Sequence, residues 1–434
     1  MHVCRALACA AVALTAGGCT RVIDAVTPQD CAADAGVAGC GTSPWPTTSH
    51  GANSDPWLVS HRTVITEMRP RVLVLNFQNG VSADSARQTA ERQVAAVAEG
   101  SRYHGYSDPN APPFLRYEIA KVVNLTDAPP PSGWLNPSST KLPTTATGDF
   151  DVAALFSAQF AALYGFTDPK DATRTLLLCE AFEQGLINEV WIQDGELGPP
   201  RRAPLSLERK QSYDGTETAV PGSFAPNAGG GGSGANIACS VTVRFAHLDG
   251  VRGPGCDLEV RGWEIESMWA ALPALRADAL AFLNRDFDTR FGLPFDGWDT
   301  ICDETGSTAC VSYPSPTVAR ATDRNGTPWT ISPFLQGCGS TTFPPNATRR
   351  GDNNNGSTTV NSRCEHFGLR DGPDGNDAYE PYNFTTKAMA LEAQFPDCGG
   401  GWQIYWRQSI PGLGTHAKSA DGSPMKNWWP LLFY

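Results

Sequence analysis

The feature that most constrains the fold is an alternation of short apolar runs with stretches of helical periodicity. Residues 71–77 form an almost wholly apolar run, which is typical of a strand covered on both faces. After Ser82, a residue type that favours helix N-caps, alanine and valine recur at helical spacing as far as Gly100. Strands separated by helices predict an α/β fold, with a largely parallel sheet flanked by helices.

Weaker patterns extend this prediction along the chain. The expected strands lie at 114–124, 189–192 and 240–246, and the expected helices at 152–164, 172–186 and 265–282, the last broken at Pro273. We predict one α/β domain over residues 61–289, with a long flexible insertion at 195–238. Residues 290–434 are rich in Gly, Pro, Trp and Cys. They predict an irregular, disulfide-pinned extension packed on the same domain.

The N-terminus has the pattern of an export signal over residues 1–18. Arg5 precedes an apolar run at 6–14 that is too short to span a bilayer. Small residues then lead into Cys19, and this junction resembles the lipobox of bacterial lipoproteins. The resemblance implies that Cys19 is lipidated and attaches the protein to a membrane; an ordinary signal peptide is the alternative. Both interpretations predict an exported protein, with residues 19–60 as a flexible tether.

The charge balance argues against nucleic acid as a partner. Without residues 1–18, which contain one Arg, the chain has 32 basic and 45 acidic residues and a formal charge of −13. No basic patch offsets the repulsion of phosphate groups. No later apolar stretch has membrane-spanning length, so any membrane attachment depends on Cys19.

The cysteine count predicts disulfides. An even number in an exported chain favours pairing, and no C-x-x-C spacing indicates zinc. Short loops make Cys31–Cys40, Cys239–Cys256 and Cys302–Cys310 plausible pairs, while Cys179 fits either a bridge or a buried thiol. The ten cysteines after Cys19 are Cys31, Cys40, Cys179, Cys239, Cys256, Cys302, Cys310, Cys338, Cys364 and Cys398.

Carboxylates that directly follow predicted strands are candidate catalytic groups. Ligands of open α/β sheets collect at the carboxyl ends of the strands. Asp194 and Glu196 follow the strand at 189–192. Such a pair can serve as general acid and base or bind a divalent cation. A solvated turn is the alternative, since Asp-Gly is common in turns.

A second candidate group begins at His247, at the end of the strand predicted over 240–246. Histidine can act as an acid–base catalyst or as a metal ligand, although a plain surface or core residue is the alternative. On a helix, Glu264 and Glu266 diverge by roughly 200°, so only one of them can face a site. We favour Glu266, which precedes a run of core-facing residues. The candidate catalytic residues are Asp194, Glu196, His247 and Glu266.

A dense set of oxygen ligands at 371–380, after His366, suggests calcium. The spacing departs from the helix–loop–helix calcium pattern, because Ala378 stands at the fifth position counted from Asp374. A polar loop bounded by disulfides fits better, and no particular metal or cofactor is indicated.

Other familiar motifs are missing. Residues 76–80 stand where a dinucleotide glycine fingerprint would lie, which disfavours a nicotinamide or flavin enzyme. Residues 231–235 approximate a nucleophile elbow, but the surrounding glycines are typical of a linker.

Three short segments resemble parts of a group of exported bacterial proteins without an assigned activity, at residues 188–192, 262–267 and 338–346. The resemblance implies that the three segments converge on one shared feature, with Glu266 and Asn346 as its polar members. The group often carries histidine where this chain has Trp263 and Thr342. These departures argue against a catalytic histidine at either position.

Together these patterns favour an exported hydrolase that acts on an extracellular polymer, peptide or glycan, through strand-end carboxylates. One alternative is a structural lipoprotein of the cell envelope that needs no site. Another is a surface module that binds a glycan or a partner protein. Its aromatic platform would comprise Trp402, Tyr405, Trp406, Trp428 and Trp429.

Overall fold

A computed structural model describes most of the chain from residue 65 onward. The described residues are 43–45, 65–126, 143, 145, 150–194, 206–226, 237, 239–270, 272–294, 297, 302, 309–323 and 325–433. The predicted export signal, the lipidation site Cys19, the candidate Glu196 and the pair Cys31–Cys40 lie outside them.

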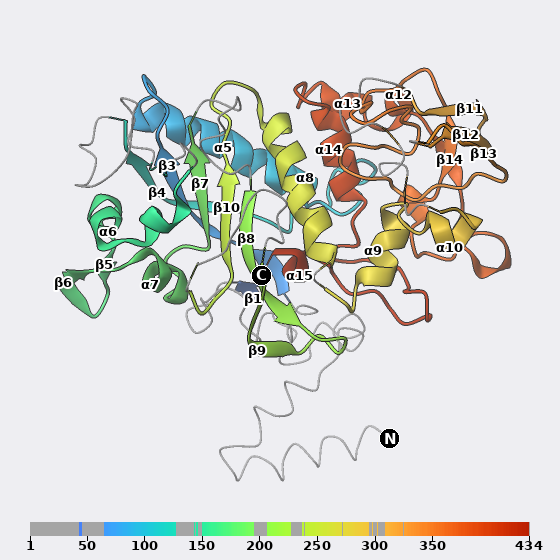
Figure 1. The fold of residues 1–434 in the computed structure, drawn as a ribbon. Helices are drawn as coiled ribbons and strands as arrows, with labels where there is room; N and C mark the ends of the chain where they lie inside the picture. Colours follow the sequence, from blue (N-terminus) through green and yellow to red (C-terminus); the bar gives the residue numbers. More distant parts are fainter. Residues whose placement is uncertain are drawn as a thin grey trace, which may run out of the picture.

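A mixed six-stranded sheet forms the centre of the molecule (Figure 1). Its strands, in spatial order, are β4 (Glu118–Asn124), β3 (Arg71–Asn76), β7 (Glu189–Gln193), β10 (Val243–His247), β8 (Ser206–Tyr213) and β9 (Ala219–Pro226). The first four are parallel to one another, whereas β8 runs antiparallel to β10, and β9 antiparallel to β8. The predicted α/β class is therefore confirmed, with an antiparallel hairpin added to the parallel strands.

Helices cover both faces of the sheet, as the apolar strands require. Val72 and Val74 of β3 belong to the larger core, with α5 (Ala83–Gly100) and α8 (Pro254–Ala270). Leu73 and Leu75 point the other way, into a core with α6 (Ala158–Tyr164) and α7 (Leu178–Glu183). This period of two explains why the strand reads as continuously apolar.

Helix α5 begins and ends where the sequence predicts. The hydroxyl of Ser82 accepts a hydrogen bond from Ser85 N at 3.1 Å, which caps the first turn. The helix predicted over 265–282 is two helices, α8 and α9 (Arg276–Phe282), interrupted near Pro273 as expected.

The helix predicted at 172–186 is wrong in its first half. Residues Asp171–Thr175 form strand β6, which pairs with β5 (Thr167–Asp168), and helix α7 starts only at Leu178. Thr173 and Thr175 are β-branched and the strand is fully exposed, so no helical packing favours the alternative.

Two segments predicted to lack structure contain strands. Ser43–Trp45, in the expected tether, forms β1, which pairs in parallel with β2 (Ile65–Met68) and buries Trp45 completely. The hairpin β8–β9 lies within the expected insertion at 195–238. The folded part of the chain therefore includes β1, in the segment predicted as a tether, and the hairpin β8–β9, in the segment predicted as a flexible insertion.

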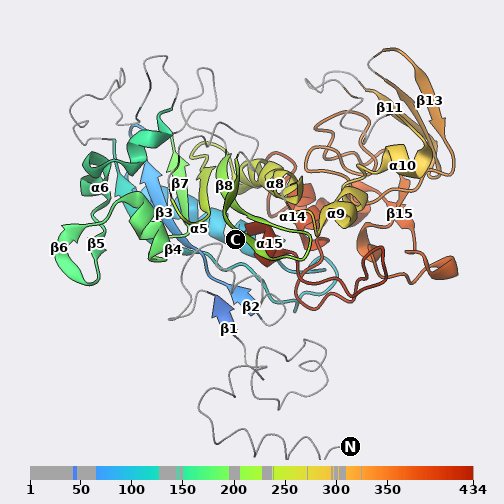
Figure 2. The same cartoon turned by 60° about the horizontal axis from the view of Figure 1, so that its bottom comes forward.

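The C-terminal part consists of short elements joined by long connections. Both views show most of it on the far side of α8 from β3 and β4, whereas α15 (Trp429–Phe433), at the C-terminus, lies on the sheet side (Figures 1 and 2). Outside this part, one further short element packs beside the sheet: the 3₁₀ turn η1 (Val152–Phe156), which precedes α6. The C-terminal elements are α10 (Phe287–Phe291), β11 (Val311–Ser315), β12 (Val318–Thr322), β13 (Pro328–Ile331), β14 (Val360–Ser362), η2 (Cys364–His366), η3 (Pro373–Gly375), β15 (Glu380–Tyr382), α12 (Phe384–Lys387), α13 (Met389–Glu392), α14 (Gly400–Gln408) and α15 (Trp429–Phe433).

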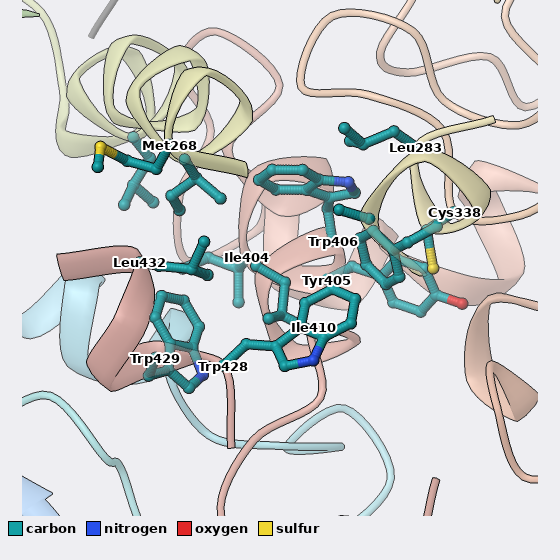
Figure 3. Packing of buried hydrophobic residues seen from close by; sticks show 14 of the residues in the cluster. Met268, Leu283, Cys338, Ile404, Tyr405, Trp406, Ile410, Trp428, Trp429 and Leu432 are labelled. Carbon is teal, nitrogen blue, oxygen red and sulfur yellow. The ribbon is translucent and has the colours of Figure 1, made fainter. Parts of the chain in front are cut away.

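The aromatic residues of this part fill the core. Each of the five rings of the predicted platform is at most 1% exposed. Figure 3 shows Trp406 and Ile404 of α14 near Met268 of α8, with Leu432 of α15 beside them. The aromatic platform of the binding-module hypothesis is therefore wrong. These rings form the core of a loop-rich region, which has few long helices or strands to supply one.

Four disulfides are present among the described residues. They join Cys179–Cys239, Cys256–Cys398, Cys302–Cys310 and Cys338–Cys364. Of the short-loop pairs, Cys302–Cys310 is confirmed and Cys239–Cys256 is wrong. Cys239 pairs instead with Cys179, and Cys256 with Cys398.

The disulfides indicate that the protein folds in an oxidising compartment. Among the described residues, no helix has the length and hydropathy needed to cross a bilayer.

Candidate functional site

The carboxyl ends of three parallel strands meet at one edge of the sheet. Asn76 at the end of β3 is in register with Gln193 at the end of β7, and His247 at the end of β10 is in register with Ile192. All three polar residues are at most 2% exposed. In open α/β sheets this edge is where ligands bind.

His247 and Asp194 form a buried pair at this edge. His247 Nε2 lies 2.7 Å from Asp194 Oδ1, and the two side chains are 2% and 4% exposed. Asp194 directly follows β7, so neighbouring parallel strands deliver the two groups side by side. The structure thus brings together two of the four residues that the sequence singled out.

Two further carboxylates, Asp249 and Asp257, interact electrostatically with His247. Asp257 lies in the first turn of α8 and accepts a hydrogen bond from Asp249 N at 2.8 Å. Asp249 accepts hydrogen bonds from Val251 N and Arg252 N, at 2.8 and 3.0 Å, and pairs with the Arg252 guanidinium. Each of the two carboxylates is at most 4% exposed.

Burial changes the ionisation of this group. Burial raises the pKa of Asp257 to about 7, although the hydrogen bond from Asp249 and the charge of His247 oppose the change. Burial alone would lower the pKa of His247. The hydrogen bond and charge of Asp194, with the charge of Asp257, outweigh burial and hold the pKa of His247 above its usual 6.5. The site therefore contains a carboxyl group that ionises near neutral pH and a histidine whose pKa is raised.

Glu266 lies elsewhere, facing the C-terminal part of the chain. Its carboxylate accepts a hydrogen bond from Thr341 N at 2.5 Å and lies 3.7 Å from an Arg285 nitrogen. Glu264 instead binds Arg244, with Nη2 to Oε2 at 2.9 Å. The predicted divergence of Glu264 and Glu266 is confirmed, and it turns Glu266 away from His247.

Asn346 is fully buried and holds a loop together. Its Nδ2 donates to Asn355 O and Thr358 O, each at 2.8 Å. These backbone contacts indicate that Asn346 has a structural role. They hold the loop at 346–358 and involve neither His247 nor Asp194.

Of the three short segments named in the sequence analysis, 262–267 contacts 338–346 directly, and Arg261 links α8 to 188–192. Gly262 packs so closely on the side chain of Thr341 that a Cβ atom would clash with it. On the sheet side, Arg261 Nη1 donates to Glu189 Oε2 at 3.3 Å. Helix α8 thus joins the other two segments.

A buried ion network lies beneath the strand-end group, between the sheet and α8. Glu189 is 1% exposed; it accepts hydrogen bonds from Tyr117 Oη at 2.5 Å and Trp191 Nε1 at 2.8 Å. Arg244 and Arg261 flank it, with Arg244 Nη1 3.5 Å from Glu189 Oε1. Burial alone would raise the pKa of Glu189, but the two arginines and the hydrogen bonds hold it below its usual range.

The predicted oxygen-rich loop is held by internal ion pairs. His366 Nδ1 lies 2.7 Å from Asp371 Oδ2, and Lys387 Nζ binds Glu365 and Glu380 at 2.9 and 2.6 Å. Within the described residues, no three His, Cys, Asp or Glu side chains are grouped to hold a metal ion.

Sequence reasoning missed Asp257 and the amides Asn76 and Gln193 at the strand ends. The signal for the amides was present, since Asn76 ends an apolar strand just as Asp194 does. Asp257 begins a helix, where an acidic residue is common for reasons of the helix dipole alone. Its proximity to His247 depends on how α8 packs against β10.

No protein-family model matches this chain, and no curated protein is significantly similar to it.

Proposed function

We propose that this protein is an exported hydrolase that acts on an extracellular polymer, with His247, Asp194 and Asp257 as its acid–base group. The observation that carries the proposal is the 2.7 Å contact between His247 and Asp194 at the carboxyl edge of the sheet, beside a buried carboxyl group. Acid–base catalysis is most efficient when the pKa values of the groups lie near the working pH.

The chemistry assigns one role to each group. Asp194 holds Nε2 of His247 and stabilises the imidazolium, which leaves Nδ1 to take a proton. His247 removes that proton from a water molecule as the water oxygen bonds to the scissile atom. Protonated Asp257 gives its proton to the leaving group as the old bond breaks. Transfer of the proton from His247 to Asp257 then restores the starting state.

The site environment supports this assignment. The side chains of Asp194, Asp257 and His247 are almost fully buried, so their charges are weakly screened by water. The disulfides fit an extracellular place of work, and attachment to a membrane through a lipid on Cys19 remains part of the proposal.

A hydrolase screen of the full chain on peptide and polysaccharide substrates tests the proposal. We expect His247→Ala to lower kcat for the hydrolysed substrate at least 100-fold, since general base catalysis contributes about 10²–10⁴ in rate. His366→Ala is the matched control: this histidine binds Asp371 at the same distance but lies in the C-terminal part. It should leave kcat unchanged.

Thermal unfolding of each variant separates lost catalysis from lost structure, and His247→Asn serves as a second variant of similar size. Hydrolysis of no substrate by the parent, or equal rates in the parent and a folded His247 variant, contradicts the proposal.

A further inference from the structure

Four side-chain amides form a row across the carboxyl ends of three neighbouring strands. Asn76 Nδ2 donates to Asn124 Oδ1 at 2.8 Å, joining β3 to β4. Gln193 Nε2, at the end of β7, donates to Gln78 Oε1 at 2.8 Å, and Gln78 N donates to Asn76 Oδ1 at 3.1 Å. The amide row, defined as Asn76, Gln78, Asn124 and Gln193, therefore lies at the same edge as the acid–base group.

One atom of this row is buried without a partner. Gln193 is 1% exposed, and within the part of the chain that the structure describes its Oε1 accepts no hydrogen bond. Buried acceptors are nearly always satisfied, because an unmet one is costly. Exchanging the amide oxygen and nitrogen of both glutamines would only turn the unmet acceptor into an unmet donor.

The backbone that follows β10 packs directly on the row. A Cβ atom at Gly250 would clash with the side-chain amides of Gln78 and Gln193, so these amides pack against the backbone of Gly250. Gly250 directly follows Asp249 and comes three residues after His247. The row and the acid–base group thus flank one short loop, which places them next to each other at the sheet edge.

The chemistry of the row selects the kind of ligand. Gln78 Nε2 donates to no described residue and Gln193 Oε1 accepts from none, so two amides joined by one hydrogen bond offer one donor and one acceptor. A hydroxyl group both accepts and donates and matches such a pair. The nearby carboxylates disfavour an anion, and Arg252 is already paired with Asp249.

We propose that the amide row binds a neutral saccharide, with a sugar hydroxyl between Gln78 and Gln193. The proposal rests on the proposed hydrolase function and names its substrate class: a neutral polysaccharide. A peptide is the competing ligand, and a single buried water is the ligand-free explanation of the unmet acceptor.

Titration calorimetry tests the saccharide proposal without relying on turnover. The probes are cellohexaose, chitohexaose, maltohexaose and laminarihexaose, with hexaalanine and hexagalacturonate for comparison, each added to full-length His247→Ala protein. We expect one neutral hexasaccharide to bind. Gln193→Met in the same background should weaken that binding about 10-fold, the size of one lost hydrogen bond to a buried group.

The matched control is Gln394→Met, which makes the same change at an exposed position in the C-terminal part and should leave affinity unchanged. Gln78→Met provides a second variant should Gln193→Met fail to fold. Binding of no neutral saccharide, or of hexaalanine alone, overturns the proposal. Unchanged affinity in the folded Gln193 and Gln78 variants identifies a buried water only and also overturns it.

The two proposals fail in different ways. A neutral saccharide that binds but is not hydrolysed by the parent supports the amide row and contradicts the hydrolase. Hydrolysis of a peptide that is lost in His247→Ala supports the hydrolase and contradicts the saccharide ligand of the amide row.

Discussion

Replacing Glu189 with alanine is expected to lower the free energy of unfolding by about 3–5 kcal/mol. Glu189 is 1% exposed. It accepts hydrogen bonds from Tyr117 and Trp191 and forms ion pairs with two buried arginines. Its loss leaves the guanidinium groups of Arg244 and Arg261 buried with less negative charge between them. Breaking such a network costs far more than its net contribution to folding, because an uncompensated buried charge remains. Urea unfolding followed by circular dichroism measures the change.

Two variants bracket the Glu189 result. Glu189→Gln keeps an oxygen that can accept from Tyr117 and Trp191 but removes the charge, so we expect a smaller loss than for alanine. Glu118→Ala removes an exposed carboxylate that lies 3.9 Å from Arg69, and it should change stability by less than about 1 kcal/mol. A loss in Glu189→Ala no greater than in Glu118→Ala would show that the network has relaxed around the missing charge.

The pH dependence of stability should change when Asp257 becomes asparagine. The pKa of Asp257 is about 7 in the folded protein and 3.8 in its ordinary state. A raised pKa means that the folded state holds its proton more tightly. The stability from this group is therefore complete below about pH 4 and is lost as pH rises to about 7. The loss amounts to up to about 4 kcal/mol at about 1.4 kcal/mol for each pH unit.

Unfolding free energies at several pH values between 4 and 8 measure this effect as the difference between Asp257→Asn and the parent. We expect the variant to gain stability relative to the parent as pH rises. His247 has the same sign, since its pKa is also raised, but it is present in both proteins and cancels to first order. Parallel curves for the two proteins would show that Asp257 ionises as freely as in the unfolded chain.

Asp421→Asn is the control for this measurement. Asp421 is exposed, and hydrogen bonds from Ser423 hold its pKa below the usual value. A lowered pKa contributes stability above that pKa and loses it as pH falls. Any change caused by Asp421→Asn therefore appears at the acidic end and has the opposite sign.

Local patterns were sufficient to predict part of this site. The apolar runs of β3, β7 and β10 identify parallel strands, and residues just past such strands must share one edge of the sheet. For this reason Asp194 and His247 could be named before their contact was known. Ser82 likewise marked the start of α5 through the chemistry of a single hydroxyl.

Tertiary packing decided what local patterns could not. Strand β8 is largely polar and β9 contains Pro and Gly, so neither has a strong strand pattern; β8 pairs with Val243–Ala246 of β10, and β9 pairs with β8. Glu264 and Glu266 both lie on α8, and only the contacts of Arg244 and Thr341 show which carboxylate points where. The raised pKa of Asp257 likewise comes from burial, which no spacing of residues reveals.

The disulfide between Cys256 and Cys398 has a consequence for the order of assembly. It joins residues 142 positions apart, and Cys256 directly precedes Asp257 in the chain. During synthesis the chain emerges from its N-terminus, so every strand of the sheet is available long before residue 398. The start of α8 can be locked only after that delay. A chain that ends before residue 398 would carry the sheet and yet leave this edge without its disulfide, which ties completion of the candidate site to synthesis of the C-terminal part.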